Sequence, residues 1–245
     1  MCLIVFAWQV VPGAPLVAAA NRDEFYDRPA AAAGAWPENP QVFGGRDLKG
    51  GGSWMGITQA GAHGPRFAAL TNIRGPQERR TDAPSRGALV ADFLAGDMSA
   101  EEYIAMIDSG SAAYNGFNLV LGDREKLFWY SNRGADDARN GKEMAPGIYG
   151  ISNSLLDVPW PKVLRAKAEF ASLLCQGAPE DAFFEMLADT TRAPDLRLPD
   201  TGIELDLERV LSAVCIETAG YGTRTSTVVK LYNDAPAELH ERVLQ

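Results

Sequence analysis

The chain has 245 residues, 46% of them hydrophobic, and carries a formal net charge of −9. This composition is sufficient for a substantial core and excludes global disorder. The negative charge argues against nucleic acid or an anionic membrane surface as partner, because both would repel the protein at long range.

The cysteine pattern indicates a reducing environment. Cys2, Cys175 and Cys215 form no C-x-x-C pair and cannot all pair with one another, so neither a disulfide framework nor a zinc ribbon fits. The apolar run over residues 1–11 is too short to span a bilayer and lacks the basic start of a signal peptide. We therefore expect a cytoplasmic protein without membrane insertion.

The two histidines do not suggest a metal site. His63 lies in a stretch rich in glycine and proline that is typical of a turn, and His240 lies in the polar C-terminal segment. The two lie far apart in the chain, so we expect no metal or other cofactor. No repeat, linker or charge run divides the chain, which favours one domain over residues 1–245.

Short apolar runs predict strands through much of the chain. The first two are joined by the turn residues 11–15 and should form a hairpin. Apolar and β-branched composition places strands at residues 2–10, 16–21, 54–58, 67–72, 117–122, 127–131, 148–152 and 226–232.

Helical patterns occupy separate stretches. Ser99 and Glu102 form a capping box at one helix start, and Pro161 and Gly177 bracket another helix. The predicted helices are 87–94, one beginning at Ser99, 161–177, 182–188 and 205–214. Because strands and helices do not alternate strictly, we predict an α+β layered sandwich with two sheets faced by helices.

Cys2 is the most informative position. Removal of the initiator methionine would expose an α-amine on the residue that also carries a thiol. The unperturbed pKa is about 7.7–8.0 for the amine and about 8.5 for the thiol, so the amine can serve as general base near neutral pH. A cysteine nucleophile then needs no histidine.

The hairpin predicts what lies beside Cys2. A turn centred near Gly13 sets Cys2 opposite Asp23 and Glu24, within the polar segment 21–24 that ends an apolar strand. Such a strand end suits a polar pocket, where a carboxylate can orient the ammonium and Arg22 can bind a thiolate or an anionic substrate group. The alternative is a solvent-exposed strand end, with Cys2 as a small core residue.

Asparagines stand at several predicted strand ends, namely Asn72, Asn118 and Asn153. An amide there can donate to a developing oxyanion, although each can equally cap a turn or helix. Glycines around Arg46 and Asp47 lack the spacing of a nucleotide-binding loop, so we expect a tight turn beside the site. The residues expected to bind substrate are Asn21, Arg22, Glu24 and Arg46.

Six ordered blocks of the chain resemble the NRDE family, which includes the transport and Golgi organisation protein 2 homologues. They cover most of the chain and comprise residues 1–4, 21–24, 44–56, 70–72, 150–154 and 221–228. The resemblance implies a four-layer αββα sandwich of the N-terminal nucleophile (Ntn) hydrolase type, similar to the penicillin V acylase and bile salt hydrolase group.

The same resemblance implies roles for individual residues. Cys2 corresponds to the nucleophile and base of that group, Asp23 to the aspartate that contacts the terminal amine, and Asn153 to the oxyanion asparagine. Asn72 corresponds to a second asparagine and Arg224 to a late active-site arginine.

Two functions compete at this point. The first is an amidohydrolase that cleaves a linear carbon–nitrogen bond of a small molecule through an acyl-enzyme on Cys2. The second is a non-catalytic protein that binds or transports haem or an acyl lipid on the same scaffold. Haem would need Cys2 or a tyrosine as axial ligand, since histidine is scarce. The sequence does not specify the substrate or the oligomeric state.

Overall fold

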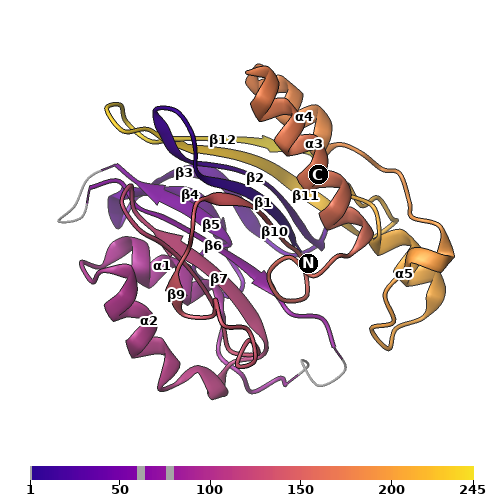
Figure 1. Ribbon diagram of the computed structural model, residues 1–245. Coiled ribbons are helices and arrows are strands. Elements are labelled where there is room, and N and C mark those ends of the chain that lie inside the picture. Colours follow the sequence, from indigo (N-terminus) through magenta and orange to yellow (C-terminus); the bar gives the residue numbers. More distant parts are fainter. Residues whose placement is uncertain (1, 60–63, 76–79) are drawn as a thin grey trace.

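The structure is a computed structural model that describes residues 2–59, 64–75 and 80–245. His63 lies outside the described residues. Two antiparallel sheets face each other, and helices cover their outer faces (Figure 1). The α+β expectation with two helix-faced sheets is thus confirmed.

The first sheet contains both chain ends. Its central strands β1 and β2 form the predicted N-terminal hairpin, and the late strand β11 pairs with β2 along most of its length. In spatial order the strands are β10 (Gly147–Ile151), β1 (Cys2–Val11), β2 (Ala14–Phe25), β11 (Tyr221–Leu231) and β12 (Glu238–Val243).

The second sheet follows the chain order, because each strand pairs with the next. Its strands are β3 (Ala30–Trp36), β4 (Asn39–Asp47), β5 (Met55–Thr58), β6 (Phe67–Asn72), β7 (Phe117–Gly122), β8 (Leu127–Ser131) and β9 (Lys142–Glu143).

The helices divide between the two outer faces. On the second sheet lie α1 (Gly87–Ala95) and α2 (Ala100–Asp108), whereas α3 (Pro161–Gln176) and α4 (Glu180–Leu187) lie on the first sheet. A fifth helix, α5 (Leu205–Leu211), follows at the side of the molecule where β1 begins (Figure 1). Within the described residues, no helix is both long and apolar enough to cross a membrane.

Local signals explain the helix ends. The Ser99 and Glu102 side chains form the predicted capping box at the start of α2. Pro161 opens α3, and Gly177 ends it in the left-handed conformation at φ 59°, which glycine adopts without a Cβ penalty. α5 ends at Leu211, earlier than predicted.

Three apolar cores fill the spaces between the layers. The central one lies between the sheets and includes Phe6 and Trp8 of β1 with Phe67 and Trp129 of the second sheet. The outer cores join each sheet to its helices. Alternate residues of β1 belong to different cores, because successive side chains of a strand point to opposite faces.

Several strands were not predicted. β3 is mostly alanine, β4 begins with a polar segment, and β12 is a polar edge strand that contains His240. None of them shows an apolar period of two. The predicted tight turn around Arg46 and Asp47 is therefore wrong in part, since β4 runs to Asp47 and the turn follows it.

Candidate functional site

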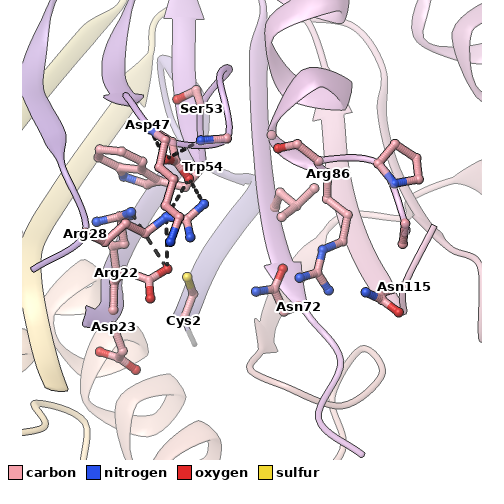
Figure 2. Close-up of a pocket in the computed structure, with 18 of the residues that line it drawn as sticks. Cys2, Arg22, Asp23, Arg28, Asp47, Ser53, Trp54, Asn72, Arg86 and Asn115 are labelled. Carbon is pink, nitrogen blue, oxygen red and sulfur yellow. Dashed lines mark hydrogen bonds and ion pairs between the residues drawn. The ribbon is translucent and has the colours of Figure 1, made fainter. Parts of the chain in front are cut away.

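A pocket of about 480 Å³ opens at the end of the sheets where β1 begins, and the Cys2 side chain lies in its wall. The ends of β2, β4 and β6 contribute to it, together with segments 49–54 and 81–87. Figure 2 shows Cys2 on one side, with Arg22, Arg28 and Trp54, while Asn72, Arg86 and Asn115 lie across the gap. The predicted nucleophile is thus accessible from a polar cavity and is not a sealed core residue.

The hairpin register differs from the prediction. Cys2 pairs with Arg22, whereas the sequence placed Asp23 and Glu24 opposite it. The register shifts between Trp8 and Val11, where Gln9 takes a positive φ of 51°. A β-bulge of this kind moves every residue beyond it relative to the partner strand, and the turn sequence does not reveal it.

The register places the two polar neighbours of Cys2 on opposite faces of the sheet. Arg22 shares the inner face with Cys2, and Asp23 faces the helices. In Figure 2 the two side chains extend in opposite directions from β2. Burial raises the pKa of the Cys2 thiol and the Asp23 carboxylate adds to this, while Arg22 and the Asp23 N–H oppose it.

Arg22 is held by an aromatic ring and a carboxylate. Its guanidinium lies 4.2 Å from the Trp54 ring centroid, and Nη2 is 3.9 Å from Glu24 Oε2. Arg28 Nη2 binds Asp47 Oδ2 at 2.7 Å, and Arg28 Nε is 3.7 Å from Glu24. The pocket wall therefore combines cations and carboxylates in close pairs, with Arg22 itself only 6% exposed.

The other face of the sheet holds a buried charge pair. Asp23 accepts a hydrogen bond from Thr223 Oγ1 at 2.7 Å, and its Oδ2 lies 3.7 Å from Lys162 Nζ at the start of α3. Asp23 and Lys162 are each 1% exposed. The predicted carboxylate beside Cys2 is present, but it lies behind the nucleophile and is already compensated by a lysine.

Further charges extend this buried cluster. Arg74 Nη1 binds Glu208 Oε2 at 2.8 Å with both side chains buried, and the guanidinium lies 4.7 Å from the Trp160 ring centroid. Tyr221 belongs to the same region: burial raises its pKa, and the charges of Asp23 and Cys2 raise it further.

The asparagines differ in their access to the pocket. Asn72, at the end of β6, is part of the lining and faces Cys2 across the gap (Figure 2). Asn153 is fully buried, and its amide donates to the Asn72 carbonyl at 2.8 Å. Its neighbour Ser152 donates to the Cys2 carbonyl at 3.0 Å. Asn118 donates to Thr71 and to the Ser154 carbonyl, away from the lining.

Besides Asn153, three predicted site residues lie outside this pocket. Asn21 donates to the carbonyls of Leu187 and Val214, which ties β2 to the helical face. Arg46 binds Glu38 at 2.6 Å on the far side of the second sheet, and Arg224 donates to the Arg28 carbonyl. These contacts support the framework around the site, and the substrate-binding and catalytic roles expected of the three stay predictions.

The loop after β4 needs glycine for a steric reason. Gly52 has φ +78°, and a Cβ there would lie 2.3 Å from the carbonyl carbon of Gly87 in α1. The Ser53 N–H donates to the same carbonyl group at 3.1 Å. This close approach draws the loop against α1 and so shapes the wall near Trp54.

Comparisons with known proteins decide the family. The profile described as "Transport and Golgi organisation 2" matches residues 1–245. The chain belongs to this family. It is 39% identical to a Bos taurus "Transport and Golgi organization protein 2 homolog" over 263 residues, covering 99% of this chain and 92% of the relative. The Homo sapiens homolog is 36% identical with the same coverage, and the Drosophila melanogaster protein is 30% identical over 270 residues, covering 98% and 90%.

This Transport and Golgi organisation 2 family member contains site residues that sequence reasoning missed. Trp54 contacts Arg22, and Asp47 pairs with Arg28. Both Trp54 and Asp47 lie in block 44–56, which carried the family resemblance, so their position in the sequence gave an indication of a role at the site. Lys162 had none, because it stands in an ordinary amphipathic helix start. Arg86 precedes α1 and reaches the pocket only because α1 packs against segment 51–53.

Among the residues that the structure describes, one group of possible metal ligands lies outside the pocket lining. Ligand atoms of Glu180, Glu238 and His240 lie within 4.8 Å of one another on the partly exposed side of α4 and β12. Lys230 Nζ is 3.7 Å from Glu180, and His240 Nδ1 contacts the same carboxylate at 2.8 Å. The carboxylate charge is thus already compensated by protein groups.

Proposed function

We propose that this protein is an N-terminal-cysteine amidohydrolase that cleaves a linear carbon–nitrogen bond of a small molecule. The observation that carries the proposal is the position of Cys2. The residue that processing would make N-terminal lies in the wall of a polar pocket, and Asp23 lies close to this first residue of β1. The arrangement of two facing sheets between two helical faces supports the four-layer αββα assignment of the Ntn type.

The chemistry follows from these groups. After removal of Met1, the Cys2 sulfur attacks the acyl carbon, and the thiol proton passes to the α-amine. Asn72 lines the pocket across from Cys2, and in this reaction its amide donates to the oxyanion. The tetrahedral intermediate expels the leaving amine, which takes the proton from the α-amine. Water then cleaves the thioester, and the free acid leaves with the thiol restored.

The pocket composition favours a polar substrate. Arg22, Arg28, Lys49 and Arg86 approach the cavity from two sides. An acyl-lipid chain would require an apolar lining. Among the described lining residues, Cys2 is the one thiol available as a haem ligand, and this part of the lining includes no histidine or tyrosine. All three cysteines are free, which supports a reducing, cytoplasmic location.

The test combines mass spectrometry with a substrate panel. Intact mass should show a chain that begins at Cys2, and hydrolysis of a panel of N-acyl amino acids should give a thioester adduct on that residue. A retained methionine, or a panel hydrolysed equally by Cys2→Ala, would refute the proposal. Haem titration is the parallel arm: a Soret change that requires Cys2, without hydrolysis, would favour the binding protein.

A further inference from the structure

Lys162 is a buried cation in an unfavourable place. It is the second residue of α3, and the N-terminus of a helix carries partial positive charge that disfavours a cation. Its side chain is 1% exposed, and burial of an ammonium is unfavourable unless other charges offset the lost hydration. Helix stability therefore does not explain a lysine at this position.

The groups around Lys162 come from five other segments. Asp23 of β2 lies 3.7 Å from Nζ, and within the described chain Nζ has no acceptor at hydrogen-bond distance. Burial lowers the pKa of Lys162, Asp23 opposes this, Arg74 lowers it further, and Cys2 opposes it. Tyr221 of β11 faces the same charges, and Glu208 of α5 is paired with Arg74.

The proposed reaction sets a requirement that Asp23 alone does not meet. A general base must be unprotonated, and a buried carboxylate in contact with an amine stabilises its ammonium form. Asp23 without a counter-charge would hold the Cys2 amine as ammonium at neutral pH. A second cation on the same carboxylate removes that effect and leaves the carboxylate free to orient the amine.

We infer that Lys162 is a positioning residue that holds the Asp23 carboxylate at the amino end of β1 and offsets its charge, so that the amine of processed Cys2 stays unprotonated at neutral pH. The inference rests on the proposed function for the processing of Cys2. The same positive charge favours the Cys2 thiolate.

The experiment uses a labelling reaction that does not depend on the identity of the natural substrate. Condensation of 2-cyanobenzothiazole with an N-terminal cysteine requires both its thiol and its free amine, so its rate against pH reports their ionisation. Lys162→Met should move the rate profile up by about one pH unit, which is roughly a tenfold slower reaction at pH 7. Lys162→Arg should restore the charge and most of the rate.

Controls separate charge from folding. Lys167→Met lies on the same helix and removes a partly exposed pair with Asp157, so its profile should match the wild type. If Lys162→Met does not fold, Lys162→Gln replaces it, and its profile should shift up in the same way. Circular dichroism and Tm verify the fold of each variant.

The outcomes distinguish the two proposals. Coincident profiles for folded Lys162→Met and wild type overturn the role of Lys162. A profile of folded Lys162→Gln that coincides with the wild type does the same. A wild-type chain that does not condense, because Met1 is retained, overturns both proposals. A shifted profile in a protein that hydrolyses nothing supports Lys162 and refutes only the amidohydrolase reaction.

Discussion

The two faces of the first sheet differ sharply at the end where Cys2 stands. On the inner face, Arg22, Arg28 and Asp47 line an open pocket and form ion pairs with 6–27% exposed side chains. On the helical face, Asp23, Lys162 and the Arg74–Glu208 pair are buried at 8% or less. The pleat of β2 produces this division, because Arg22 and Asp23 are adjacent in sequence. A single strand end thus contributes both to the pocket wall and to a buried cluster of charges.

The largest expected effect is a loss of activity on removal of the Cys2 thiol from the pocket face. Cys2→Ala should reduce amide hydrolysis at least about 1,000-fold, because it removes the nucleophile. Its free energy of unfolding should change little, since the side chain borders a cavity. Steady-state kinetics and urea unfolding measure the two effects. Activity comparable to wild type in Cys2→Ala would assign the chemistry to another residue.

The second prediction concerns the stability of the buried charge cluster on the helical face. Arg74→Met should lower the free energy of unfolding by roughly 3–5 kcal/mol, because it leaves the Glu208 carboxylate buried without its partner. The double variant Arg74→Met with Glu208→Leu should recover much of this loss. Chemical denaturation measures both. A loss below about 1 kcal/mol for Arg74→Met would show that water reaches this pair.

A third prediction sharpens the role of the far pocket wall. Asn72→Ala should reduce kcat by about 100- to 1,000-fold, the range for loss of one oxyanion donor. Asn115→Ala is the matched control on the same wall and should have a smaller effect. Equal effects of the two variants on kcat would contradict a specific oxyanion role for Asn72.

The smallest expected effect is the pH dependence of the stability contributed by the partly exposed Arg28–Asp47 pair. Burial raises the pKa of Asp47, but hydrogen bonds from Arg28 and the loop amides outweigh it and leave the pKa below its usual value. Because the pKa of Asp47 is lower in the folded state, its carboxylate stabilises the protein at pH values above the unfolded-state pKa of about 3.9. This stabilisation is lost as the pH falls through the folded-state pKa. Asp47→Asn should therefore lower Tm slightly at pH 7, and the difference should shrink below about pH 4. A constant difference in thermal melts from pH 7 to 3 would refute this linkage.

Sequence and structure agree where the signal is local. The helix starting after Ser99, the Pro161–Gly177 helix and the N-terminal hairpin are set by capping groups, turn residues and apolar period, which neighbouring residues encode. The family was also readable from ordered motifs and is confirmed over residues 1–245. The same local logic missed β3, whose alanines carry no period.

The sequence by itself determined most of the helices and strands, the family and the presence of polar residues around Cys2. The tertiary structure alone decided which of them share a face. A bulge near Gln9 paired Cys2 with Arg22, and helix packing buried Lys162 against Asp23. Register and packing depend on contacts between distant segments, and a linear pattern of residues does not contain them.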